Sequence, residues 1–227
     1  MLIYSIRRAI KHIGYIVRSA TRERPAAALV HVLQETYNLI RERFSAMLVG
    51  WPQSTLGVGS KVIGTRGISV GKNASIKRQA WIEAVFDYNE QSFEPSIMIG
   101  QKFLAADRLH ISSINRIEIG DNCLFGSSVY ISDHNHGSYK GSEQSNPSEP
   151  PIKRKLVSFG PVIIGSNVWL GDNVIIVGPA RIGNGVVIGA NSVVTRDIPD
   201  NVIAAGAPLR ILKSYNEENG LWEKYGQ

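Results

Sequence analysis

The stretch VIIGSNVWLGDNVIIVGPARIGNGVVIGANSVV, residues 162–194, carries an aliphatic residue at every sixth position. The step runs through Ile164, Leu170, Ile176, Ile182, Ile188 and Val194. A helix repeats its buried face about every 3.6 residues and a strand about every two, so a step of six is typical of neither. The step predicts a solenoid of short strands and tight turns, with one aliphatic side chain of each hexapeptide pointing inward.

The same step extends upstream, so the repeats run from about residue 56 to residue 212. It passes through Val70, Ile76 and Ile82, then Ile99, Ala105, Ile111 and Ile117, and then, out of phase, Ile119, Phe125 and Ile131. The fifth hexapeptide position is also small or aliphatic, at Val168, Val174, Val186, Ser192 and Cys123. These side chains should point inward too, which makes Cys123 a core residue and not a nucleophile. Three hexapeptides complete one triangular turn, and successive turns lie about 4.8 Å apart.

We therefore expect a mainly β protein in three parts. These are an N-terminal helical segment at 1–50, a β-helix domain at 51–213 and a C-terminal tail at 214–227. A stacked column has two open ends that need covers, and the two flanking parts are the candidates.

The N-terminal segment predicts two amphipathic helices. The first has a stripe at Ile3, Ile6, Ile10, Ile13 and Val17, and the second has one at Leu29, Leu33, Tyr37, Ile40, Phe44 and Leu48. Pro25 is well placed to open the second helix. We expect the apolar faces to cover one end of the column or to meet a neighbouring subunit. The alternative is peripheral contact of the first helix, which carries Arg7, Arg8, Lys11 and Arg18, with an anionic membrane.

Composition narrows the class of protein. The 227 residues carry a net charge of +6, of which residues 1–50 contribute +5. No base-stacking aromatic pattern accompanies this charge, so nucleic acid is not an expected partner. A single cysteine excludes an intrachain disulfide and a cysteine-rich zinc site. With no membrane-spanning run and no signal core, a cytoplasmic location is the default expectation, with the inner membrane face as the peripheral alternative.

The run from residue 163 to residue 213, IIGSNVWLGDNVIIVGPARIGNGVVIGANSVVTRDIPDNVIAAGAPLRILK, resembles the hexapeptide-repeat acyltransferases. Within them it is similar to the branch of maltose, galactoside and Nod-factor acetyltransferases and lipopolysaccharide O-acetyltransferases. The resemblance implies a left-handed parallel β-helix, a homotrimer, and acetyl-CoA lying between neighbouring columns. The chain departs from the family where relatives have PGV and PAK-like residues, at Val177–Ala180 and at Pro208–Arg210.

Two insertions interrupt the repeats, and insertions are where solenoids tend to carry function. They are Phe86–Ser96 and a longer one at residues 133–158, which opens with Asp133, His134, Asn135 and His136. Acyl transfer to a hydroxyl needs a base, and histidine suits that task near neutral pH. The bland alternatives are a hydrogen-bonded loop start without chemistry and a metal site, for which a third, distant ligand is missing.

The resemblance implies one histidine base at the start of this loop, and the motif Asn135–His136–Gly137 points to His136, with His134 second. His134 lies two residues away and would face the same side of a strand. Asp133 could orient whichever imidazole acts. Trp169 stands at an outward-pointing position, which predicts a subunit contact, a wall of the acetyl-donor site, or both.

The resemblance also implies acetyl-CoA contacts at five positions. They are Asp172, where the galactoside branch has serine, Ala190, Thr195, Arg210 and Lys213. Small residues let the pantetheine approach the backbone, and cations suit the nucleotide phosphates.

The expected function is acetyl-CoA-dependent O-acetylation of a sugar hydroxyl by direct transfer, without a metal, in surface polysaccharide or lipopolysaccharide biosynthesis. One rival is N-acetylation of an amino sugar, which could be nucleotide-linked, because an amine attacks more readily than a hydroxyl. The other is a non-catalytic solenoid that holds a partner. Turnover and CoA binding separate these hypotheses.

Overall fold

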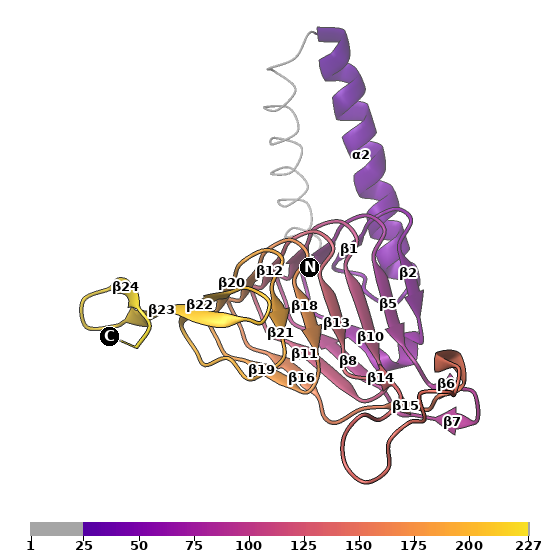
Figure 1. Ribbon diagram of the computed structural model, residues 1–227. Coiled ribbons are helices and arrows are strands. Elements are labelled where there is room, and N and C mark those ends of the chain that lie inside the picture. Colours follow the sequence, from indigo (N-terminus) through magenta and orange to yellow (C-terminus); the bar gives the residue numbers. More distant parts are fainter. Residues whose placement is uncertain (1–24, 227) are drawn as a thin grey trace.

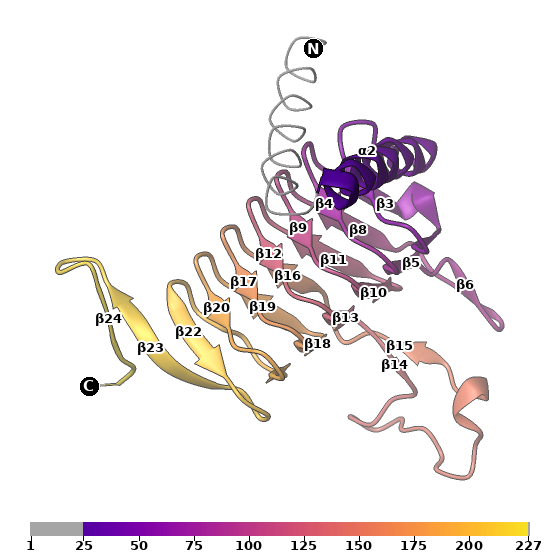
Figure 2. The same cartoon turned by 90° about the horizontal axis from the view of Figure 1, so that it is seen from above.

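A computed structural model of the chain describes residues 25–226, and three sheets, parallel except for the last two strands of the first, form the three walls of a column (Figures 1 and 2). Sheet A holds, in spatial order, β1 (Thr55–Leu56), β4 (Ser75–Ile76), β9 (Leu104–Ala105), β12 (Leu124–Phe125), β17 (Trp169–Leu170), β20 (Val187–Ile188), β22 (Val202–Ala205), β23 (Arg210–Asn216) and β24 (Leu221–Lys224). Sheet B holds β2 (Lys61–Ile63), β5 (Trp81–Ala84), β10 (His110–Ser113), β13 (Tyr130–Ser132), β18 (Ile175–Val177) and β21 (Val193–Val194). Sheet C holds β3 (Ile68–Val70), β8 (Ser96–Ile99), β11 (Arg116–Ile119), β16 (Val162–Ile164) and β19 (Ala180–Ile182). The predicted parallel β-helix is confirmed.

The register of the strands shows how the six-residue step becomes a column. Leu170 pairs with Ile188, eighteen residues further on, so one coil contains three hexapeptides. The coil that links Ile111 to Ile131 is longer, at twenty residues. The parallel pairing of strands in successive coils is therefore kept when a coil contains extra residues, provided that these residues lie at the corners between sheets.

The aliphatic positions of the repeat form the core. Those of residues 162–194 are at most 2% exposed, and so are the fifth-position residues, Cys123 included. Within the column Phe103 and Phe125 stack edge to face, with ring centroids 4.9 Å apart. Burying a Val, Leu or Ile side chain contributes about 1.5–3 kcal/mol, so the regular stack supplies the main stabilisation of the fold.

The corners need left-handed backbone, and asparagine supplies it at many of them. Asn167, Asn173 and Asn191 have φ values of 58°, 57° and 58°. Asparagine tolerates this region better than most residues because its short side chain hydrogen-bonds locally. The sharp turns thus keep each coil triangular without a glycine at every corner.

Helix α2 (Pro25–Leu48) contacts the first coil through β1. Its predicted apolar stripe does not cover the column, because Leu33, Ile40 and Phe44 are 61%, 65% and 56% exposed. The opposite face lies on the column, where Ala46 is fully buried. Covering the column end with this stripe is therefore a wrong expectation. The first predicted helix, with its possible membrane contact, lies outside the described residues.

The C-terminal tail extends sheet A and does not lie across the open end of the column (Figure 2). β23 pairs antiparallel with β22, and β24 pairs antiparallel with β23. The edge strand β22 offers unpaired backbone groups that a following strand satisfies directly, which explains why the tail becomes a hairpin and not a lid. The expected boundary near residue 213 therefore falls inside β23.

Both insertions project from the same side of the column (Figure 1). The first contains a hairpin of β6 (Asp87–Tyr88) and β7 (Gln91–Ser92). In the second, β14 (Asn135–His136) pairs antiparallel with β15 (Leu156–Val157). Short 3₁₀ turns are η1 (Thr65–Gly67) and η2 (Pro151–Lys153). Within residues 25–226, none of the helical segments combines the length and apolar character needed to cross a bilayer.

Candidate active site

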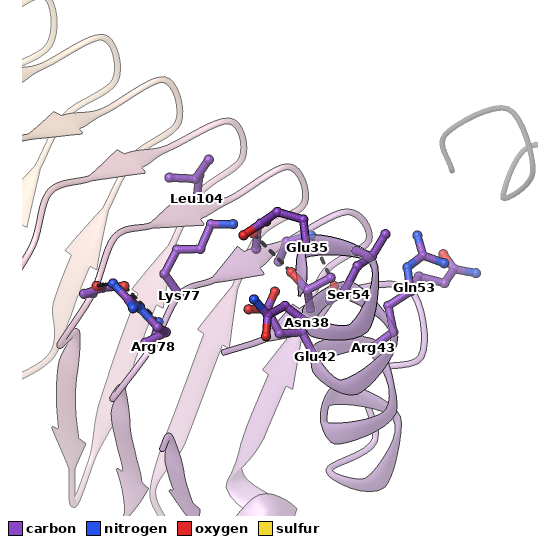
Figure 3. A pocket seen from close by; sticks show the side chains of 14 residues that line it. Glu35, Asn38, Glu42, Arg43, Gln53, Ser54, Lys77, Arg78 and Leu104 are labelled. Atoms are coloured by element: carbon purple, nitrogen blue, oxygen red, sulfur yellow. Dashed lines mark hydrogen bonds and ion pairs between the residues drawn. The ribbon is translucent and has the colours of Figure 1, made fainter. Parts of the chain in front are cut away.

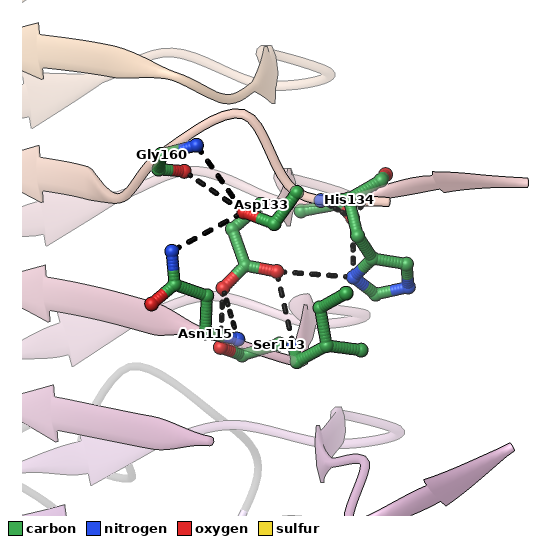
Figure 4. A network of polar contacts seen from close by, with 8 residues as sticks. Ser113, Asn115, Asp133, His134 and Gly160 are labelled. Atoms are coloured by element: carbon green, nitrogen blue, oxygen red, sulfur yellow. Dashed lines mark hydrogen bonds and ion pairs between the residues drawn. The ribbon is translucent and has the colours of Figure 1, made fainter. Parts of the chain in front are cut away.

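Asp133 follows β13 directly, at the corner between sheets B and C, and its side chain is completely buried. The coil below supplies three donors, namely the Ser113 hydroxyl at 2.6 Å and the backbone N–H groups of Ile114 and Asn115 at 3.0 Å each. A fourth contact joins Oδ1 of Asp133 to Nδ1 of His134 at 3.0 Å (Figure 4). A buried carboxylate needs hydrogen bonds to both oxygens, so this corner is built to hold a negative charge.

The extra length of one coil creates this corner. Between Ile111 in sheet B and Ile119 in sheet C the step is eight residues instead of six, because the chain bulges around Ser113. This bulge turns two backbone N–H groups toward Asp133. From the coil above, Gly178 packs so closely that a Cβ on it would lie 3.2 Å from Cα of Asp133.

The electrostatics of the corner determine the tautomer of His134. Burial alone would raise the pKa of Asp133, but the hydrogen bonds from His134, Ser113 and the two backbone groups outweigh it and lower that pKa below its usual 3.8. Asp133 is therefore ionised at neutral pH and can only accept hydrogen bonds. In the neutral imidazole of His134, Nδ1 must then carry the hydrogen, which leaves the lone pair on Nε2, as a general base requires.

His136, which the resemblance ranked above His134, has a different environment. Its Nδ1 lies 3.2 Å from the Tyr88 hydroxyl, the two rings meet edge to face, and the side chain is exposed. The expectation that the two histidines share one face of a strand is wrong, since β14 begins at Asn135 and His134 precedes it. Asp133 orients His134 and not His136.

The two insertions are joined by hydrogen bonds. The Tyr88 hydroxyl donates to the carbonyl of Ile152 at 2.6 Å. Gln91 bonds the backbone of Leu156 twice, donating at 3.2 Å and accepting at 2.8 Å. The β6–β7 hairpin therefore holds the long loop beside the Asp133–His134 corner, a connection that neither insertion reveals in the sequence.

Asp172, for which the resemblance implies a contact with acetyl-CoA, has a hydrogen-bond partner within the column. Its Oδ1 accepts a hydrogen bond of 2.6 Å from the backbone N–H of Ser127 in the coil below. Other corners repeat the arrangement, with carboxylates accepting from the backbone N–H one coil below at Asp107, Asp121 and Asp200. The side chain of Asp172 thus ties two coils together.

The other predicted donor-binding residues lie on the last coils and are exposed. Ala190 stands one coil above Asp172, at the corner that follows sheet A, because the N–H of the next residue bonds the carbonyl of Asp172 at 2.9 Å. Arg210 and Lys213 belong to β23, where Arg210 pairs with the end of β22 nearest that corner. Thr195 follows β21 and lies at a different corner, between sheets B and C.

Trp169 points outward, as predicted, and is 52% exposed. It pairs with Leu124, which pairs in turn with Leu104, so the three side chains form an apolar ridge along sheet A. His134 lies at the corner between sheets B and C. The ridge and the imidazole are therefore on different faces of one column.

A polar cavity of about 560 Å³ lies elsewhere, between α2 and the start of sheet A (Figure 3). Glu35 and Glu42 of the helix face Lys77 and Arg78 of the column there. None of the predicted site residues lines this cavity, although Leu104 at the end of the Trp169 ridge does. Within residues 25–226, no group of three His, Cys, Asp or Glu side chains is placed to hold a metal ion.

Sequence reasoning missed four contributors to the corner and to the loop. They are Ser113, Ile114, Asn115 and Tyr88. A signal for the first three exists, because the aliphatic step changes phase between Ile117 and Ile119. The sequence offers no comparable signal for Tyr88, since its partners His136 and Ile152 lie 48 and 64 positions further on.

Two models of hexapeptide-repeat families match parts of this chain. A family model described as bacterial transferase hexapeptide (six repeats) matches residues 161–196, and one described as hexapeptide repeat of succinyl-transferase matches residues 116–132. The chain is 52% identical over 119 residues to the putative lipopolysaccharide biosynthesis O-acetyl transferase WbbJ of Escherichia coli K12, covering 52% of this chain and 60% of that protein. It is 35% identical over 146 residues to the galactoside O-acetyltransferase of the same organism, covering 64% and 66%.

A putative acetyltransferase of Schizosaccharomyces pombe is 32% identical over 163 residues, which cover 66% of this chain and 74% of that protein. The aligned regions span less than two thirds of both Escherichia coli relatives. Among solved structures, a point mutant of the N-acyltransferase AntD from Bacillus cereus, in complex with dTDP and coenzyme A, superposes with a TM-score of 0.57 at 20% identity. That superposition covers 78% of this chain and 91% of AntD, and it concerns the fold alone.

Proposed function

The chain belongs to the hexapeptide-repeat acetyltransferase family and has its left-handed parallel β-helix, and on this premise we propose that it transfers the acetyl group of acetyl-CoA to a sugar hydroxyl. The acceptor class rests on the 52% identity to a putative lipopolysaccharide O-acetyl transferase, so we place the reaction in surface polysaccharide or lipopolysaccharide biosynthesis. The observation that carries the chemistry is the buried Asp133 carboxylate, 3.0 Å from Nδ1 of His134.

We assign His134 as the general base and Asp133 as its positioning residue. Nε2 of His134 takes the proton of the acceptor hydroxyl while its oxygen attacks the thioester carbon, forming the new C–O bond. When the tetrahedral intermediate collapses, the C–S bond breaks and the sulfur of CoA receives that proton from the imidazolium. The ionised Asp133 stabilises the transient positive charge, and a base of this kind contributes about 10²–10⁴-fold to the rate.

The separation of the site residues favours a catalytic centre between copies of the chain. His134 and the Trp169 ridge occupy different faces of one column, so a second column must bring a ridge to the imidazole. We therefore propose a homotrimer with acetyl-CoA between neighbouring columns. An exposed apolar ridge also favours burial against another copy.

In this arrangement the donor lies along the last coils. Ala190 lets the pantetheine approach the backbone, and Thr195 offers a hydroxyl further along the column. Arg210 and Lys213 are exposed cations suited to the nucleotide phosphates. Asp172 takes part only through its corner bond to the coil below, which shapes the wall.

The acceptor sugar binds on the side of the two joined insertions. His136 is exposed there, beside Tyr88, and the loop between β14 and β15 offers polar side chains for a glycan. We propose that His136 contacts the acceptor and does not remove its proton.

The test compares His134→Ala with the matched variant His136→Ala, using CoA release with acetyl-CoA and sugar acceptors. We expect kcat to fall by about 10²–10⁴-fold in His134→Ala, whereas His136→Ala changes KM for the acceptor more than kcat. Equal thermal unfolding of both variants is the folding control. Full turnover in His134→Ala, or loss of kcat only in His136→Ala, would overturn the assignment. Undiminished acetylation of an amino sugar by His134→Ala would instead favour N-acetylation.

A further inference from the structure

Helix α2 carries an apolar stripe that nothing within residues 25–226 covers. Eight large apolar side chains on it are each 53–70% exposed: Leu29, Val30, Leu33, Tyr37, Ile40, Phe44, Met47 and Leu48. The helix meets the column with its opposite face, through the buried Ala46. A stripe this long on a helix that is already anchored indicates an interaction surface.

The spacing of the stripe shows what kind of partner fits. Val30, Leu33, Tyr37, Ile40, Phe44 and Met47 follow the alternating three- and four-residue steps of a heptad. Such a narrow seam is typical of packing against another helix, whereas helices that lie on membranes present a broad apolar face between basic residues. The charges agree, because α2 carries Glu35 and Glu42 against Arg41 and Arg43 and is electrically balanced. The surface therefore favours a helix as its partner.

The chain contains a matching seam in the residues that precede α2. Ile3, Ile6, Ile10, Ile13 and Val17 also follow alternating three- and four-residue steps. Seven residues, 18–24, separate Val17 from the start of α2 at Pro25. Connections of this length join antiparallel neighbours in helical bundles.

We propose that residues 3–17 form a helix that packs antiparallel on the α2 seam. Folding the chain back about residues 21 and 22 brings five layers into register without a gap. The layers are Val17 with Ala26, Ile13 with Val30, Ile10 with Leu33, Ile6 with Tyr37 and Ile3 with Ile40. In each layer a position that precedes a three-residue step on one helix meets a position that precedes a four-residue step on the other, so the two seams stay in step along the hairpin.

The hairpin occupies its own seam more readily than a second copy could. A segment tied to α2 by seven residues is held at a millimolar effective concentration, which another chain reaches only in concentrated solution. The basic residues Arg8 and Lys11 lie off the first seam and stay exposed on the outer face of the hairpin. The N-terminal charge would then be carried by a rigid helical arm that projects from the column.

Disulfide trapping tests this arrangement in the full chain. The double variant Ile10→Cys/Leu33→Cys places two thiols in one layer, and Arg8→Cys/Leu33→Cys is the matched control with one thiol off the seam. Cys123 is buried and can stay, with the wild type as the blank. We expect mild oxidation to give a cross-link within the chain in the first variant only, at a rate unchanged over about a tenfold dilution.

Three outcomes would overturn the proposal. One is equal or absent intrachain cross-linking in the two double variants. Another is dimer formation by Leu33→Cys alone, which would show that a second copy occupies the seam. The third is sedimentation of the wild type, but not of Leu33→Glu, with vesicles of anionic lipid, which would assign the stripe to a membrane. The melting temperature is the folding control. Leu33 and its partner positions lie outside the column, so these substitutions should leave the melting of the column unchanged.

Discussion

Replacing Asp133 with asparagine changes one atom and should disturb both stability and chemistry. Each carboxylate oxygen meets a backbone N–H, since Oδ1 accepts from Ile114 and Oδ2 accepts from Asn115. Whichever oxygen becomes the amide nitrogen, two donors then face each other in a buried corner. A buried group left without its partner costs about 1–3 kcal/mol, so Asp133→Asn should lower the free energy of unfolding by that amount.

The same substitution should slow the reaction. Losing a charge-assisted hydrogen bond of about 1.5–3 kcal/mol to His134 reduces kcat about 10- to 100-fold. If the amide nitrogen turns toward His134, Nδ1 accepts and Nε2 carries the hydrogen, which removes the base. A double-mutant analysis tests whether Asp133 acts through His134. If it does, Asp133→Asn should cost little further activity in a His134→Ala background.

The pH dependence of stability supplies a second readout. The folded pKa of Asp133 lies below its unfolded value, so its stabilisation is complete above about pH 4 and is lost as pH falls through the folded pKa. The difference in thermal stability between wild type and Asp133→Asn should therefore stay constant between pH 7 and about pH 5 and narrow as pH falls below about 4. Wild-type kcat in Asp133→Asn, or a stability difference that persists unchanged at pH 3, would refute the reasoning.

Three further predictions concern the column, the long loop and His110 in sheet B. Leu170 is buried, so Leu170→Ala should lower the free energy of unfolding by about 2–5 kcal/mol in denaturant titrations. Its neighbour Trp169 is exposed, so Trp169→Ala should change the free energy of unfolding of the single chain by no more than about 0.5 kcal/mol but should reduce activity. Tyr88→Phe removes the 2.6 Å bond to the long loop, so limited proteolysis of that loop should accelerate and KM for the acceptor should rise with little change in kcat. Burial lowers the pKa of His110, whose ring stacks on that of Trp81 with the centroids 4.7 Å apart. The folded state therefore favours the neutral imidazole, and the free energy of unfolding should fall as pH drops below 6.5. His110→Asn should remove this pH dependence in thermal unfolding.

The six-residue step was sufficient to predict the column because it is a local code. An inward aliphatic side chain such as Leu170, a corner asparagine and a short strand all follow from residues within one hexapeptide. Any chain that repeats this unit must stack it, since a single coil cannot bury its own apolar residues. The place of the long insertion followed from the same logic, because the repeat stops at Ile131.

The proposal that His134 and not His136 is the base rests on residues that are distant in the sequence. Asp133 is charged and fixed only because Ser113 and Asn115, nearly one coil earlier, stack directly beneath it. That stacking depends on the bulge between sheets B and C, and the motif Asn135–His136–Gly137, which points to His136, carries no information about it. The same holds for the apolar stripe of α2. Its amphipathic pattern shows that the helix has an apolar face, but the pattern does not show which neighbour that face meets. Local periodicity thus specifies a repeating scaffold, whereas the environment of a side chain depends on which coils become neighbours.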